Sequence, residues 1–197
     1  MSLTLAVKPT IVDRVVPNSL AADIALVVGG ASLTALAAQL QFMVPGNPVP
    51  FTFQTMAVLL TGAALGSTRG AISMALYALA GLILPVYSQG SQGISVLLGA
   101  TGGYIFGFIV AAALVGFLAE RKFSSNVLKM FVAYVLGSAV IYAVGVPVLA
   151  VVAAGGNFSK ALEWGLYPFL AWDAVKAVVA GGLLPSAWAL VRKVKGN

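Results

Sequence analysis

The chain has 197 residues, of which 60% are hydrophobic and 8% are charged, against about 25% charged residues in an ordinary soluble domain. This composition excludes a water-soluble globule and leaves room for six bilayer crossings of about 20 residues each. Because the sequence has no cysteine and no histidine, disulfides, thiolate sites and the usual haem and zinc ligands are excluded, and a redox or zinc enzyme is not expected.

Six apolar segments predict an all-α integral membrane protein with one domain and six transmembrane helices. The polar residues 1–19, which include two prolines, are expected to stay outside the lipid as a cytoplasmic N-terminal segment. Connections rich in proline, glycine or charge separate the segments. The helices are expected at about 20–44, 53–66, 69–87, 101–119, 127–153 and 168–191.

The basic residues indicate which side of the membrane each connection faces. Most of them lie on one side of the predicted membrane: before the first helix, between the second and third, between the fourth and fifth, or at the end of the chain. These residues are Lys8, Arg14, Arg69, Arg121, Lys122, Lys129, Arg192, Lys193 and Lys195. The positive-inside rule therefore predicts that both termini are cytoplasmic, and the net charge of +6 reflects topology rather than nucleic-acid binding. The connections expected outside, 45–52, 88–100 and 154–167, carry only Lys160 and Glu163. Such a neutral surface suits a neutral or weakly charged ligand.

The first predicted helix contains a stripe of small residues. Ala31 and Ala35 are one helical turn apart, with Gly30 and Ala38 nearby, and small residues permit close contact between helices in lipid. The stripe predicts either docking onto another membrane subunit or packing inside this chain.

Three prolines between residues 45 and 50 stiffen the first outer connection and bring Gln54 to the start of the second predicted helix. Several aromatic residues map near the same outer side, where an interfacial belt is expected for most of them. For Tyr104 and Trp172, which neighbour other candidate site residues, a stacking pocket is an equal alternative. The aromatic residues concerned are Phe51, Phe53, Tyr87, Trp164, Tyr167, Phe169 and Trp172.

The segment 88–104 has no charge and is rich in glycine at both ends, with apolar residues between. Glycine permits tight turns and close approach of the backbone to a ligand. We interpret the segment as a lid over a cavity, with a flexible connector as the alternative. The sequence has no phosphate-binding P-loop motif, so the chain is not expected to hydrolyse ATP itself.

Asp173 and Lys176 are the ionisable pair expected inside a predicted span, three residues apart on one helix face. A charge at the bilayer centre costs about 2.5–3.5 kcal/mol on insertion scales, so such residues usually face a cavity or a partner. The pair is either a structural ion pair or a binding site that offers a carboxylate acceptor beside an ammonium donor. A cyclic urea or amide matches that arrangement. Intramembrane proteolysis is disfavoured because its histidine or second buried aspartate is missing.

These residues resemble the BioY family, the biotin-specific substrate-binding subunits (S components) of energy-coupling-factor (ECF) transporters. The resemblance covers nearly the whole chain. It rests on Pro48-Val49-Pro50-Phe51-Thr52-Phe53-Gln54-Thr55, Gly62-x-x-Leu65-Gly66-x-x-Arg69-Gly70, Gly90-x-x-Gly93, Leu98-Gly99-x-x-Gly102-Gly103-Tyr104 and Asp173-x-x-Lys176.

The resemblance implies a multi-pass protein of a prokaryotic cell membrane that captures biotin and works with a transmembrane T component and two ABC-type ATPase subunits. It needs no cofactor and no metal, and it is not an enzyme. By the same resemblance, Asp173 and Lys176 bind the head group of biotin, and Gln54, Gly90, Ser91, Gly93 and Tyr104 complete the pocket. The chain has Ser91 and Ile105 where some members have Asn and Arg, so the contact to the carboxylate tail stays open. The alternatives are an S component for another vitamin, a solitary membrane facilitator and a small membrane-embedded enzyme.

Overall fold

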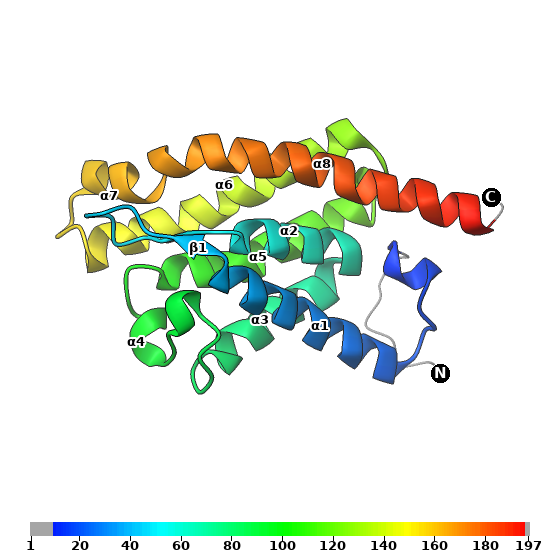
Figure 1. Cartoon of the computed structure of the whole chain (residues 1–197), viewed down its shortest axis with the longest axis horizontal. Helices are drawn as coiled ribbons and strands as arrows, with labels where there is room; N and C mark the ends of the chain where they lie inside the picture. The colour runs from blue at the N-terminus through cyan, green and yellow to red at the C-terminus, as the bar shows by residue number, and fades with distance from the viewer. Residues whose placement is uncertain (1–9, 196–197) are drawn as a thin grey trace.

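The computed structural model describes residues 10–195 and is a bundle of helices (Figure 1). A two-stranded antiparallel sheet joins the first two helices, pairing Gln41 with Thr52 and Phe42 with Phe51. The elements are α1 (Leu20–Gln39), β1 (Gln41–Phe42), β2 (Phe51–Thr52), α2 (Gln54–Leu65), α3 (Ser67–Ala80), α4 (Ile94–Leu97), α5 (Gly102–Ala119), α6 (Val127–Val152), α7 (Phe158–Gly165) and α8 (Tyr167–Lys195). Short 3-10 turns lie at Val12–Arg14, Ser88–Gly90 and Phe123–Ser125.

Within residues 10–195, four stretches are long and apolar enough to cross a membrane: Leu20–Gln39, Gly102–Ala119, Val127–Val152 and Phe158–Val191. The chain is therefore a multi-pass membrane protein. Helices α2 and α3 have 12 and 14 residues, which corresponds to about 18–21 Å at 1.5 Å per residue. This is shorter than a hydrocarbon core of about 30 Å.

Two predicted helices end earlier than expected. Helix α1 stops at Gln39 rather than near residue 44, because the chain then enters the β1–β2 hairpin. Helix α3 stops at Ala80 rather than near residue 87. There the ring of Tyr87 occupies the space beside Gly81, and its hydroxyl donates a 2.6 Å hydrogen bond to the carbonyl of Ala78. Neither the hairpin pairing nor the Tyr87 contact can be predicted from hydropathy, so both helices were predicted too long.

Helix α5 forms the centre of the bundle and packs against α2, α3 and α6. Glycine allows the close approach of three of these helices: a Cβ on Gly62 would lie 2.9 Å from the Cα of Ala112, and one on Gly70 would lie 2.9 Å from the Cα of Gly62. Larger side chains at these positions would push α2, α3 and α5 apart.

The elements divide into two ends of an elongated molecule (Figure 1). The first and last described residues lie at one end, and β1, α4 and α7 lie at the other. At the terminal end, the indole of Trp188 on α8 donates a 3.0 Å hydrogen bond to Ser124 Oγ. The amide of Ser67, at the start of α3, donates a 2.7 Å bond to Glu120. The terminal segments and the α2–α3 and α5–α6 connections therefore gather together.

A buried ionic cluster also lies at the terminal end, and it corrects the expectation that Asp173 and Lys176 are the one ionisable pair in the helices. Arg69 is in the first turn of α3 rather than in a loop, and it is 1% exposed. Its Nη2 lies 2.7 Å from Asp13 Oδ1, and its Nε lies 2.8 Å from Oδ1 of Asp23 on α1. Burial favours the neutral form of Asp13, but hydrogen bonds from Thr10 and Arg69 outweigh it and hold the pKa of Asp13 below its ordinary value.

Candidate functional site

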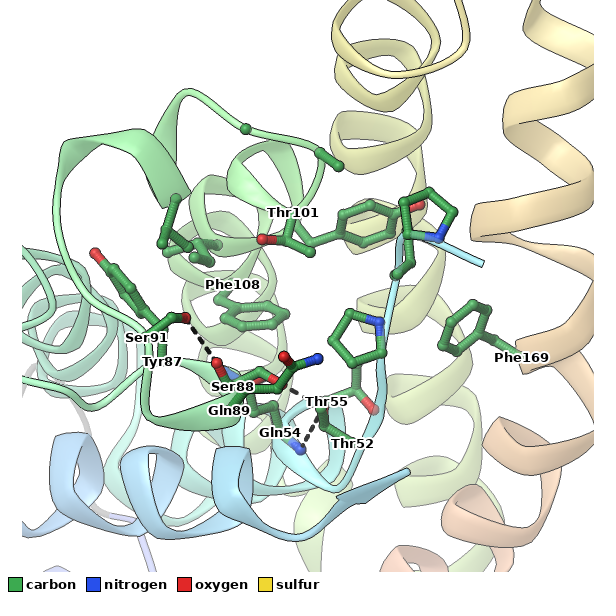
Figure 2. A pocket seen from close by; sticks show the side chains of 18 of the residues that line it. Thr52, Gln54, Thr55, Tyr87, Ser88, Gln89, Ser91, Thr101, Phe108 and Phe169 are labelled. Atoms are coloured by element: carbon green, nitrogen blue, oxygen red, sulfur yellow. Dashed lines mark hydrogen bonds between the residues drawn. The ribbon is translucent and has the colours of Figure 1, made fainter. Parts of the chain in front are cut away.

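A cavity of about 280 Å³ lies at the end of the bundle away from the termini (Figure 2). Its lining comes from the β1–β2 hairpin, the start of α2, the last turn of α3, the segment between α3 and α5, and the facing sides of α5, α6 and α8. Pockets for small ligands combine apolar walls with a few polar groups. The ring of Phe108 supplies one wall, and Phe169 lies on the α8 side (Figure 2).

The predicted pair from α8 lies against the start of α2. Lys176 is 2% exposed and lines the cavity. Its ammonium donates hydrogen bonds of 2.9 Å to Asp173 Oδ1 and 2.8 Å to Thr55 Oγ1. The hydroxyl of Tyr142 on α6 donates to the other carboxylate oxygen of Asp173. One buried cation and one buried anion are thus joined to two hydroxyl groups from other helices.

The two members of the pair face different spaces. Asp173 lines a second, mostly apolar cavity of about 570 Å³ between α6, α7 and α8, and Tyr142 lines both cavities. The ion pair and Tyr142 therefore stand at the boundary between the two cavities. An ammonium donor faces the first cavity, with the carboxylate acceptor directly behind it.

Gln54 and Tyr104 both line the first cavity, as the sequence predicts, but their polar atoms already have partners in the chain. The Gln54 amide donates a 2.6 Å hydrogen bond to Tyr77 Oη, and its oxygen accepts a 3.2 Å bond from Thr52. The Tyr104 hydroxyl donates a 3.0 Å bond to the carbonyl of Gly165. Both side chains thus hold the cavity walls together.

The turn that contains Gly90, Ser91 and Gly93 borders the cavity, but only one of these three predicted site residues lines it. Ser91 lines the cavity, whereas Gly90 and Gly93 shape the turn through positive φ angles of 62° and 98°. The Ser91 hydroxyl donates a 2.6 Å hydrogen bond to the carbonyl of Ser88. The next elements, α4 and the residues after it, contribute Ser95, Val96 and Thr101 to the lining.

Three of the aromatic residues expected to form an interfacial belt are buried instead, namely Phe51, Phe169 and Tyr87, which is 1% exposed. Phe51 on β2 and Phe169 on α8 are 5% and 7% exposed, and their rings stack with centroids 4.1 Å apart. The ring of Phe42 also stacks on that of Phe51, with centroids 4.7 Å apart. Trp172 makes edge contacts with Phe42 and Phe53 rather than lining the first cavity. This stack attaches the hairpin to α8.

The small-residue stripe of α1 faces inward over much of its length. Ala31 and Ala38 are 7% and 0% exposed, and Ala35 is half-buried. A Cβ on Gly30 would lie 2.8 Å from Ser73 Oγ on α3. This burial favours internal packing of Ala31 and Ala38. The exposed residues of α1 include the large Val28, Leu33 and Leu36 and also the small Ala25, Gly29 and Ser32.

Sequence reasoning missed several residues of the site, and Thr55, Tyr142 and Phe108 are three of them. Thr55 follows Gln54 directly, but nothing in its spacing indicates contact with a helix more than a hundred positions later. Tyr142 lies in the middle of an apolar segment, and a polar hydroxyl at such a position could have indicated a site residue. Phe108 has no distinguishing signal among the chain's 10 phenylalanines.

Comparisons with known proteins agree with this architecture. The biotin transporter BioY of Thermotoga maritima is 41% identical over 138 residues, which cover 70% of this chain and 79% of that protein. The probable biotin transporter BioY of Pyrococcus horikoshii is 35% identical over 161 residues, covering 81% of this chain and 92% of that protein. The crystal structure of the S-component for biotin from an ECF-type ABC transporter has a similar fold. Its TM-score is 0.74 at 23% identity, covering 90% of this chain and 92% of that chain. The BioY family matches residues 8–193, and the chain belongs to that family.

Proposed function

We propose that this chain is the biotin-binding S component of an ECF transporter. The observation that carries the proposal is the Lys176 ammonium, buried at 2% exposure in the wall of a cavity and joined to Asp173 and Thr55. Membership of a family whose matched relatives are named as biotin transporters supports the choice of ligand. A transport subunit, rather than an enzyme, is the function that these names support.

The chemistry of the pair fits the head group of biotin, a cyclic urea with two N–H donors and one carbonyl acceptor. The Lys176 ammonium would donate to the carbonyl, and the Asp173 carboxylate would accept from an N–H. Because Lys176 faces the cavity and Asp173 lies behind it, access of the head group to the carboxylate would require a shift of Tyr142 or Thr55. The rings of Phe108 and Tyr104 would then pack against the apolar body of the ligand.

The proposed topology has six crossings with both termini in the cytoplasm. Support comes from the gathering of the terminal segments with the α2–α3 and α5–α6 connections at one end (Figure 1). Exposed basic residues occur at this same end, including Arg121 and Lys122. The cavity would then open toward the outside of the cell.

The proposed partners are a transmembrane T component and two ABC-type ATPase subunits. The sequence has no P-loop motif, so the energy of ATP hydrolysis would have to come from those subunits. Exposed apolar residues of α1, such as Leu36 at 68% exposure, offer a surface on which a membrane partner could pack. Docking through Ala31 and Ala35 would require these residues to leave their internal contacts.

Equilibrium binding of radiolabelled biotin to the purified chain in detergent tests the proposal. We expect saturable binding of one biotin per chain that excess unlabelled thiamine or riboflavin does not displace. Displacement by either vitamin would indicate an S component of other specificity. Absence of saturable biotin binding by folded protein would contradict the proposed function.

A further inference from the structure

The rim of the first cavity is uncharged. The sequence has no charged residue in 40–53 or 81–101, the two outer segments that border the cavity. Among the residues that line the cavity, all of which are described, Lys176 carries the one charge. Lys176 is 2% exposed and engaged with Asp173 and Thr55, so it belongs to the buried part of the cavity rather than to its rim.

In place of a charge, the rim offers neutral hydrogen-bonding groups. Gln89 is exposed and lines the cavity. In Figure 2 the side chains of Ser88 and Gln89 lie together beside the ring of Phe108. Among the described residues, neither the Gln89 carboxamide nor the hydroxyls of Ser95 and Thr101 form a hydrogen bond within the chain. A carboxamide and a hydroxyl can each both donate and accept.

The backbone holds Gln89 in an unusual conformation at the rim. Its φ of 63° and ψ of 24° lie in the left-handed region, which few residues other than glycine and asparagine adopt. Gln39 on α1 holds the turn on both sides: its amide donates a 3.0 Å hydrogen bond to the carbonyl of Tyr87, and its oxygen accepts a 3.1 Å bond from the amide of Gly90. Non-glycine residues in this region cluster at ligand-binding sites.

We propose that Gln89 and the hydroxyls of Ser95 and Thr101 bind the tail end of the ligand through hydrogen bonds that do not depend on the charge of the tail. The chain would then bind neutral tail amides of biotin as tightly as biotin itself. The inference rests on the proposed function. A carboxylate tail accepts hydrogen bonds from the amide N–H and the hydroxyls. A carboxamide tail does the same and also donates to the Gln89 oxygen. The rim has no cation that would bind a carboxylate more tightly than a carboxamide.

Competition binding of biotin and of its primary amide to the purified chain tests the inference. We expect the two dissociation constants to agree within about threefold. A ratio outside that range in either direction would overturn the inference, while biotin binding itself would still support the proposed function. If neither compound bound, the result would contradict the proposed function, and with it this inference.

Variants of Gln89 identify the residue responsible. Gln89→Gly keeps the left-handed backbone accessible but removes the carboxamide, and it should weaken both ligands to the same extent. Gln89→Asn keeps an amide on a residue that tolerates this φ and should retain more of the affinity. Gln89→Arg should create a preference for biotin over the amide of tenfold or more. Gln92→Gly, at an exposed residue outside the cavity lining, is the matched control and should change neither affinity. Equal binding of both ligands by Gln89→Gly and by the parent would exclude Gln89 from the site.

Discussion

The ammonium of Lys176 on α8 donates a 2.8 Å hydrogen bond to Oγ1 of Thr55, a residue 121 positions earlier in the chain, at the start of α2. The same hydroxyl lies 3.5 Å from Asp173 Oδ1. Thr55 therefore bridges both members of the ion pair and connects the two halves of the bundle at the cavity. The relationship shows that α2 is part of the site even though it carries no charge.

Replacing Thr55 should weaken biotin binding through Lys176. Thr55→Val removes a hydrogen bond to a buried charge, which is worth about 1.5–3 kcal/mol, so we expect affinity to fall by about tenfold or more. Thr55→Ser should restore most of the loss. Thr61→Val on the same helix is the control, because its buried hydroxyl has no hydrogen-bond partner among the described residues. Parent-like biotin affinity of Thr55→Val, measured by equilibrium binding, would contradict the assignment.

Breaking the ion pair should separate its role in binding from its role in folding. Lys176→Met and Asp173→Asn each leave a buried partner without its counter-charge, so both should lower thermal stability and weaken biotin binding by tenfold or more. The double variant should regain stability without regaining affinity, because it leaves no stranded charge and no charged site. Lys193→Met, at an exposed lysine on the same helix, should change neither property.

Two outcomes of that experiment would identify the pair as structural. One is parent-like biotin affinity in either single variant. The other is a loss of bound biotin that follows the loss of folded protein in every variant.

The Asp13–Arg69 contact should make stability depend on pH in the acid range. The folded-state pKa of Asp13 lies below its ordinary value of 3.8, so the carboxylate stabilises the fold above that pH and loses this effect as the pH falls through the folded pKa. Asp13→Asn should lower the melting temperature at pH 7. A charge-assisted hydrogen bond is worth about 1.5–3 kcal/mol, and each kcal/mol corresponds to roughly 2–4 °C in a protein of this size.

Thermal melts of the parent and Asp13→Asn between pH 7 and pH 3 provide the measurement. The difference between the two should shrink below pH 3.8. Arg14→Gln, at the exposed neighbouring residue, should follow the parent throughout. A difference that stays constant over the whole range would show that the charge of Asp13 does not contribute.

Cysteine labelling should reveal the orientation of the two ends. Because the chain has no native cysteine, single variants report on one position each. Gln92→Cys, in the exposed turn beside the cavity, should react with an impermeant thiol reagent in intact cells. Arg121→Cys, at the α5–α6 connection, should react only after the membrane is opened. The reverse pattern would place the cavity in the cytoplasm and overturn the proposed topology.

Substitutions on α1 should distinguish internal packing from docking. Ala31→Trp places a large side chain at a position that is 7% exposed, so it should destabilise the isolated chain and reduce biotin binding. Leu36→Trp, at a position that is 68% exposed, should leave folding and binding unchanged. If Ala31→Trp folded and bound biotin normally but blocked transport in cells with the energising subunits, the predicted docking role of Ala31 would be supported instead.

Composition and local pattern determine much of this protein. Long apolar segments cannot be exposed to water, and their backbone groups must be paired within lipid, so hydropathy alone predicts a helical multi-pass membrane protein. The spacing of Asp173 and Lys176 places them on one helix face, and their cost in lipid marks them as a buried pair. Both inferences depend on interactions within one segment, which sequence spacing describes directly.

The tertiary structure decided which groups the pair meets and which predicted residues lie in the cavity. Thr55 and Tyr142 reach Asp173 and Lys176 from other helices. Gln54 and Tyr104 line the cavity with their polar atoms already bonded to other segments. Arg69 became a buried partner of Asp13 and Asp23 rather than a loop residue. These relationships depend on how α2, α5, α6 and α8 pack, and hydropathy is nearly the same on all faces of such apolar helices. The glycines that allow close packing and the contacts across the bundle therefore set the site, and both act between segments far apart in the sequence.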